Sequence, residues 1–88
     1  MVKRKRIDYL NDPYYEMGSK LKKLRKEHGM TIADLAERID LSEKIISNYE
    51  NGYNRMTIET IIRIYNFETF GPRSLEELLQ IFILEIFE

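Results

Sequence analysis

The chain has 88 residues, with 14 Lys or Arg against 15 Asp or Glu, one histidine and no cysteine. This length supports one small domain with a single core, and it disfavours an enzyme with a deep cleft. A disulfide framework and a thiolate zinc site are excluded, and His28 cannot build a metal site alone.

The charged residues are unevenly distributed, although the net charge is only −1. Residues 1–28 carry nine basic and four acidic side chains, residues 29–56 three and five, and residues 57–88 two and six. One end of the chain could therefore lie near phosphates. The sequence has neither a signal peptide nor an apolar run long enough to span a bilayer, which favours a cytoplasmic protein with no membrane contact.

The chain begins with the basic run MVKRKR. A block of like charge cannot be buried, and it is typical either of a solvated tail or of an arm that neutralises DNA phosphates. The sequence leaves both interpretations open. The second one assigns phosphate contacts to four residues: Lys3, Arg4, Lys5 and Arg6.

The first helix is expected over residues 13–28, because Asp12 and Pro13 suit a helix cap and a first helical position. Gly29 is expected to end it in a left-handed conformation. Gly18 lowers the helix propensity, so a start near Gly18 is the alternative. Four apolar residues at three- and four-residue spacing form the expected inner face: Tyr14, Met17, Leu21 and Leu24.

Two short helices joined by a tight turn are predicted next. Thr31 and Asp34 form a T-x-x-D cap for a helix that ends near residue 39. The small Ala36 would let a second helix cross closely. After a turn at residues 40–41, that second helix is expected over residues 43–51.

The second helix has a predicted cap at each end, Ser42 at its start and Gly52 at its end. Its apolar residues Ile46 and Tyr49 are expected to be buried. Ile45 belongs to the same apolar stripe.

The C-terminal third predicts two more helices. Thr57 would cap the first, and Ser74 would cap the second in an S-x-x-E box. The second is apolar nearly all round, which predicts a partner besides its own domain. The expected inward face of the first comprises Ile58, Ile61, Ile62 and Tyr65.

The stretch MGSKLKKLRKEHGMTIADLAERIDLSEKIISNYENG resembles the Cro/phage-repressor (Xre-like) helix-turn-helix family. The family pattern is a G-x-x-L-x-x-x-R helix, a T-x-x-x-L-A helix and an I-S-x-x-E-x-G helix. The resemblance implies an all-α fold, a compact five-helix lambda-repressor-like DNA-binding domain. It implies three segments: a basic arm and lead-in over residues 1–11, the helix-turn-helix domain over 12–67, and a turn with a dimerisation helix over 68–88.

The resemblance also implies a DNA-binding site. The third helix of the pattern would enter the major groove and read bases with Glu43, Lys44, Ser47 and Asn48. Lys44 suits guanine and Asn48 suits adenine, whereas Glu43 either accepts from cytosine or only favours the helix N-terminus. Ile45 has a partly exposed position in the family, where it either contacts a thymine methyl group or completes the core. By family position, the phosphate contacts are Thr31, Asn51, Tyr53, Asn54 and Arg55.

Family position further predicts an ion pair between Arg25 and Glu50, with two solvated charges as the alternative. Two residues depart from the pattern. Ile32 replaces a polar phosphate contact, and Asp40 replaces the usual glycine of the turn. These departures predict modest affinity for each monomer.

Together these features predict a sequence-specific, double-stranded DNA-binding transcriptional regulator, a repressor acting as a homodimer, with no enzymatic activity, cofactor or metal. The alternative is a protein-interaction module with a protein partner on its C-terminal helix. Such a module would be an antitoxin or the detached DNA-binding domain of a larger peptide-sensing regulator. The residues expected to pair two copies are Leu78, Leu79, Phe82, Ile83, Ile86 and Phe87.

Overall fold

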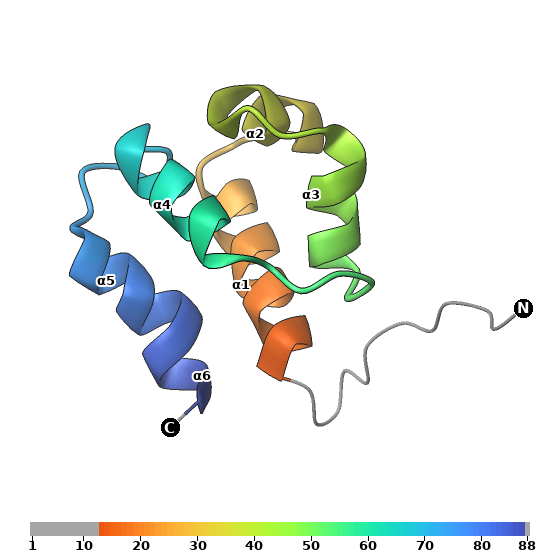
Figure 1. Cartoon of the computed structure of the whole chain (residues 1–88). Helices are drawn as coiled ribbons and strands as arrows, with labels where there is room; N and C mark the ends of the chain where they lie inside the picture. Colours follow the sequence, from red (N-terminus) through yellow and green to blue (C-terminus); the bar gives the residue numbers. More distant parts are fainter. Residues whose placement is uncertain (1–12, 88) are drawn as a thin grey trace, which may run out of the picture.

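A computed structural model describes residues 13–87, and this part of the chain contains only helices and connecting turns (Figure 1). The C-terminal helix is continuous and consists of α5, the π-helical segment η1 and α6. The prediction of an all-α, five-helix fold is therefore confirmed. The elements are α1 (Pro13–Glu27), α2 (Ile32–Ile39), α3 (Glu43–Glu50), α4 (Ile58–Asn66), α5 (Leu75–Leu79), η1 (Gln80–Leu84) and α6 (Glu85–Phe87).

Some predictions fall outside the described part of the chain. The four basic residues of the proposed arm, Lys3, Arg4, Lys5 and Arg6, lie there, as does the expected cap Asp12. The side chains of Tyr14 and Phe87 lie outside it as well.

Side-chain caps determine where the later helices begin. Thr31 Oγ1 accepts from the backbone N–H of Asp34 at 3.0 Å, and Asp34 Oδ2 accepts from the N–H of Thr31 at 2.9 Å. These reciprocal bonds satisfy amides that a helix start leaves without an intrahelical partner. The caps predicted from sequence are confirmed at Thr31, Ser42, Thr57 and Ser74.

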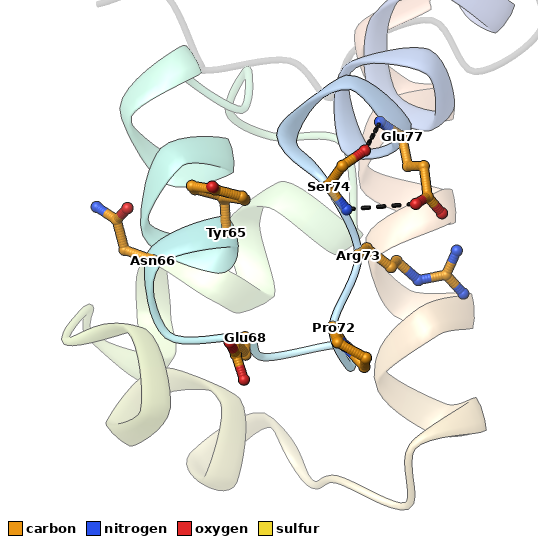
Figure 2. A pocket seen from close by; sticks show the side chains of 7 residues that line it. All are labelled: Tyr65, Asn66, Glu68, Pro72, Arg73, Ser74 and Glu77. Carbon is orange, nitrogen blue, oxygen red and sulfur yellow. Dashed lines mark hydrogen bonds between the residues drawn. The ribbon is translucent and has the colours of Figure 1, made fainter.

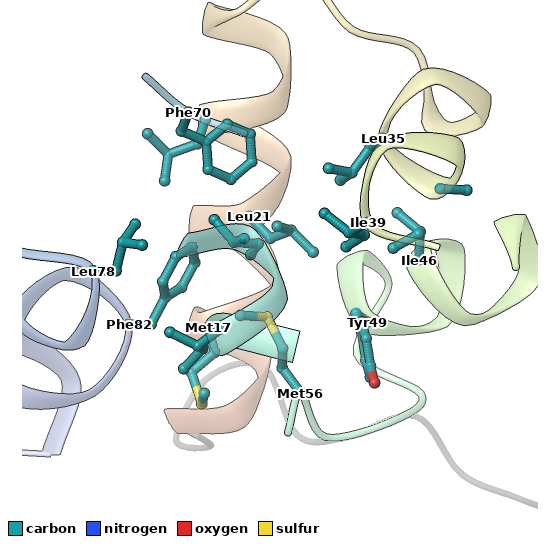
Figure 3. Packing of buried hydrophobic residues seen from close by; sticks show 14 residues of the cluster. Met17, Leu21, Leu35, Ile39, Ile46, Tyr49, Met56, Phe70, Leu78 and Phe82 are labelled. Carbon is teal, nitrogen blue, oxygen red and sulfur yellow. The ribbon is translucent and has the colours of Figure 1, made fainter. Parts of the chain in front are cut away.

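The core is built around α1, which lies between the α2–α3 pair and the C-terminal helix (Figure 1). Figure 3 shows Leu78 and Phe82 approaching α1 from one side, with Leu35, Ile39 and Ile46 on the other. The buried cluster comprises Met17, Leu21, Leu24, Leu35, Ala36, Ile39, Ile46, Tyr49, Met56, Ile61, Ile64, Phe70, Leu78 and Phe82.

Gly18 lies where α1 and α3 cross. A Cβ atom added at Gly18 would lie 1.8 Å from the carbonyl oxygen of Tyr49, which belongs to the backbone of α3. The helix nevertheless begins at Pro13, as the first of the two sequence interpretations has it. Glycine lowers the helix propensity of α1, but it allows the close crossing, because a larger residue would push the two helices apart.

The predicted inward face of α4 is wrong for three of its four residues. Ile61 is buried, whereas Ile58, Ile62 and Tyr65 are 54%, 41% and 40% exposed. Relative to the prediction, α4 is rotated about its axis so that Thr60 faces inward. The Thr60 hydroxyl lies 3.1 Å from Thr57 Oγ1 and 3.3 Å from the Tyr49 hydroxyl. The spacing of apolar residues cannot predict that a threonine is buried when hydrogen bonds satisfy its hydroxyl.

The C-terminal helix packs on its own chain. Leu78 and Phe82, two of the residues expected at a dimer interface, instead fill the core of the same molecule, with 2% and 0% of their surfaces exposed. Leu79, Ile83 and Ile86 are partly buried against that core. Among the described residues, no helix is both long and apolar enough to cross a membrane.

Candidate nucleic-acid interface

The turn between α2 and α3 has a left-handed residue at its centre. Asp40 has φ 57° and ψ 49°. Its N–H donates to the Glu37 carbonyl at 3.4 Å, and the Leu41 N–H donates to the Ala36 carbonyl at 2.9 Å. These two bonds form a Schellman motif, in which glycine is the usual left-handed residue. Aspartate tolerates this conformation better than most residues, though at a steric cost that glycine does not carry.

The inner side of α3 fixes its position. Ile46 is fully buried and Tyr49 is 7% exposed, and both belong to the core that α1 and α2 share. Ile45 is half-buried and packs against the same core. This packing matches the core alternative for Ile45.

A buried ion pair joins α1 to the last residue of α3. Arg25 Nε and Nη2 donate to the two carboxylate oxygens of Glu50 at 2.7 and 2.9 Å, and Arg25 Nη1 donates to the Met30 carbonyl at 2.8 Å. The hydrogen bond to Glu50 raises the pKa of Arg25 and outweighs the opposing effect of burial. The bidentate geometry fixes the distance and the relative orientation of the two helices.

The outer side of α3 carries the four residues assigned to base reading, which we call the recognition face: Glu43, Lys44, Ser47 and Asn48. Glu43 and Lys44 are exposed, and Ser47 and Asn48 are half-buried. Their spacing places all four on one side of the helix. The structure thus brings together one carboxylate, one ammonium, one hydroxyl and one amide group on a firmly held helix.

The loop after α3 folds back onto the end of that helix. The N–H groups of Tyr53 and Asn54 donate to the Asn48 carbonyl at 2.8 and 3.2 Å, and Asn51 Nδ2 donates to Ser47 Oγ at 3.2 Å. Asn51, Tyr53 and Arg55 are exposed and Asn54 is half-buried. The loop residues expected at phosphates therefore lie next to the recognition face.

The start of α2 is more acidic than a phosphate site usually is. Thr31, also expected at a phosphate, is exposed, but Asp34 closes the capping box beside it. Ile32 is half-buried and packs on the core, which explains why an apolar residue is tolerated at that position.

We expect the Asp34 cap to make α2 sensitive to acid. Hydrogen bonds from the backbone and side chain of Thr31 lower the pKa of Asp34 below its ordinary 3.8. A carboxylate with a lowered pKa stabilises the fold above its unfolded-state pKa, and this contribution is lost as the pH falls through the folded-state value. An NMR titration should show a lowered pKa that moves toward 3.8 in Thr31→Val. Because the backbone N–H of residue 31 still donates to Asp34 in this variant, the pKa should move only part of the way, and a wild-type Asp34 pKa at or above 3.8 would contradict the cap.

A shallow hollow lies away from α3, between the end of α4 and the start of α5 (Figure 2). Its polar groups already serve the fold. Ser74 and Glu77 form a capping box, and Arg73 Nε donates to the Phe70 carbonyl at 3.1 Å. Among residues 13–87, no three His, Asp or Glu side chains are grouped so that they could hold a metal ion. We assign no chemistry to this hollow.

Two arginines that the sequence did not single out cap helix ends. Arg38 on α2 donates to the Phe67 carbonyl at the end of α4, and Arg63 on α4 donates to the Ile39 and Asp40 carbonyls at the end of α2. One sequence feature pointed toward Arg63, namely its i, i+4 spacing from Glu59.

Comparison with known proteins gives a family match over residues 21–67, described as helix-turn-helix. The chain is 40% identical over 47 residues to a protein of Pyrococcus horikoshii, and 36% identical to proteins of Pyrococcus abyssi and Thermococcus gammatolerans. All three are named HTH-type transcriptional regulatory proteins. Each match covers 53% of this chain but only 15% of the relative. No solved structure matches significantly.

Proposed function

Since this chain belongs to the helix-turn-helix family of transcriptional regulators, we propose that it binds double-stranded DNA sequence-specifically through the recognition face of α3. The observation that carries the proposal is the contrast between the two sides of α3. Ile46, Tyr49 and Glu50 are buried and hold the helix, while the opposite side carries hydrogen-bonding side chains, of which Glu43 and Lys44 are exposed and Ser47 and Asn48 are half-buried. A rigid helix with such a face suits the major groove.

Within this proposal, Lys44 donates to guanine and Asn48 bonds adenine, while Ser47 contacts a base or a phosphate. Glu43 either accepts from cytosine or only favours the start of α3. Phosphate contacts come from Thr31 and from the loop residues Asn51, Tyr53, Asn54 and Arg55. The basic N-terminal arm, Lys3, Arg4, Lys5 and Arg6, adds charge attraction.

Lys44→Ala and Asn48→Ala are each expected to lower affinity for the preferred site about 5- to 150-fold, because a good base contact contributes about 1–3 kcal/mol of discrimination. Binding to random DNA should change far less. Fluorescence anisotropy with the preferred duplex and with a random duplex measures the ratio of specific to random affinity. Lys22→Ala, which removes an exposed lysine of α1, is the control and should leave the ratio unchanged. Wild-type ratios in both α3 variants would overturn the assignment of the recognition face.

We further propose that the protein acts as a homodimeric repressor in the cytoplasm, by binding and without a catalytic step. Exposed apolar side chains support a second copy. Ile58, Ile62 and Tyr65 follow one another on the outer side of α4, and Leu84 is 49% exposed on η1. From the C-terminal helix, Leu79, Ile83, Ile86 and Phe87 stay candidates for the dimer contact. A two-fold dimer would present two α3 helices to half-sites about 34 Å apart.

The alternative is a protein-interaction module, such as an antitoxin or the DNA-binding part of a larger peptide-sensing regulator. The small share of each relative that the chain matches, 15%, supports the second version. Light scattering coupled to size exclusion separates the two functions. A stable dimer favours the regulator, whereas a monomer that requires another protein favours the module.

Selection of bound duplexes from a random DNA library is the most informative test. The proposal predicts an enriched motif whose affinity falls steeply as the salt concentration rises. If the protein dimerises on DNA, two half-sites should recur at a fixed spacing. Selection that enriches no motif, even at low salt, would overturn sequence-specific DNA binding.

A further inference from the structure

Arg63 is placed to act on the recognition face without touching it. It lies on α4, outside the α2–α3 pair, yet its Nη1 donates at 3.1 Å to both the Ile39 and the Asp40 carbonyls. Those two carbonyls belong to the turn from which α3 starts. One side chain therefore ties α4 to the turn that sets the direction of α3.

The guanidinium group of Arg63 is itself held in place. Glu59, one helical turn earlier on α4, accepts from Arg63 Nε at 3.2 Å and from Nη2 at 3.0 Å. This leaves Nη1 directed at the turn. The Glu59 carboxylate is 71% exposed, so this contact orients the planar guanidinium and contributes little stability of its own.

Two features make the turn unfavourable, and hydrogen bonds from Arg63 would offset both. Carbonyls in the last turn of a helix lack intrahelical partners and carry the negative end of the helix dipole, which a cation stabilises. Asp40 also occupies the left-handed position without the freedom of glycine. Its own carboxylate lies 3.8 Å from Arg63 Nη1 and is almost fully exposed, so it adds little.

We propose that Arg63, oriented by Glu59, is a positioning residue for DNA recognition: it fixes the left-handed Asp40 turn and thereby the angle between α2 and α3. This inference rests on the proposed DNA-binding function. A change in this angle would move the recognition face relative to the phosphate contacts at the start of α2. A misdirected α3 would lose base contacts before it loses general attraction to DNA.

Arg38 provides a matched control. It also joins α2 to α4, and it donates to the Phe67 carbonyl at 3.0 and 3.3 Å. Arg38→Met removes the same charge and two similar hydrogen bonds, but at the end of α4 rather than at the turn. General effects of charge and of helix docking should therefore be shared by Arg38→Met and Arg63→Met.

Hydrogen exchange of the Leu41 amide, measured by NMR on the protein without DNA, tests whether Arg63 stabilises the α2–α3 turn. This amide bonds the Ala36 carbonyl across the turn. Arg63→Met should speed its exchange roughly tenfold or more relative to core amides, because bonds from a charged donor are lost. Arg38→Met should leave it unchanged. Unchanged exchange in Arg63→Met would overturn the positioning role, whether or not the protein binds DNA.

The DNA-binding consequence is tested by anisotropy on the selected duplex and on random DNA, at a temperature where all variants are folded. Arg63→Met should lower the ratio of specific to random affinity roughly tenfold, and Arg38→Met no more than about twofold. In an Asp40→Gly background, Arg63→Met should cost much less, because glycine adopts the left-handed turn freely. Equal losses in both backgrounds would contradict the mechanism. A wild-type protein that fails to bind DNA would overturn the proposed function instead.

Discussion

Gly18→Ala should destabilise the fold by about 3 kcal/mol, although alanine is ordinarily the better helix former by about 1 kcal/mol. The reason is the crossing of α1 and α3, where the new Cβ would lie 1.8 Å from the Tyr49 carbonyl oxygen and 2.8 Å from its carbon. Both atoms belong to the backbone, so no side-chain rotation relieves the overlap. The helices must separate, and the core between them loses contacts.

Thermal unfolding followed by circular dichroism measures this effect. A loss of about 3 kcal/mol in a domain of this size lowers Tm by roughly 12–24 °C. Gly29→Ala is a useful comparison because its Cβ would meet nothing within 4 Å, while its φ of +69° remains unfavourable for alanine. We expect an intermediate loss there, of about 1–2 kcal/mol. A Gly18→Ala protein at least as stable as wild type would show that α1 and α3 do not cross as described.

Arg25→Met should cost about 3–5 kcal/mol, because it leaves the Glu50 carboxylate buried without its partner. Both side chains are nearly inaccessible, with 7% of Arg25 and 5% of Glu50 exposed. The Met30 carbonyl would lose its hydrogen bond at the same time. Urea denaturation should detect the change as a lower midpoint with a similar slope.

The double variant Arg25→Met, Glu50→Leu should be much more stable than the sum of its single changes predicts. A buried ion pair replaced by apolar residues of similar volume is often neutral for stability, because no charge is left unpaired. Lys20→Met, which removes the exposed pair with Glu85, is the matched control and should cost under about 1 kcal/mol. Equal costs for Lys20→Met and Arg25→Met would contradict a special role for the buried pair.

The local features of this fold could be predicted from sequence because they depend on neighbouring residues. Thr31 with Asp34 and Ser74 with Glu77 have the spacing of capping boxes, and Gly29 has the left-handed conformation expected at a helix end. The family resemblance over the α1–α3 region predicted the order of the helices.

Features that depend on long-range packing could not be predicted in the same way. The inward face of α4 turned out to be Thr60, Ile61 and Ile64, because the Thr60 hydroxyl has partners that no periodicity reveals. Arg63 was not singled out in the sequence, where its one local signal is the i, i+4 spacing from Glu59. Its contacts with the α2–α3 turn depend on how α4 is docked.

The sequence predicted which residues belong to the candidate site, but it did not predict how firmly the helix that carries them is held. Lys44, Ser47 and Asn48 followed from the family pattern, and the structure places them on one side of α3. How firmly that side is held depends on Glu50 and on the close approach at Gly18. In the sequence Gly18 resembles a weak point in a helix, and the burial of the predicted Arg25–Glu50 pair depends on packing that the sequence does not show.

The position of Phe70, Leu78 and Phe82 bears on where the folding unit ends. The family match stops at residue 67, yet these three residues fill the same core as Met17 and Leu21. A fragment cut at the family boundary would leave a hole beside α1 and expose its apolar side. The segment recognised across the family is thus smaller than the unit that folds, so the last helix of this chain should be kept in any excised or transplanted domain.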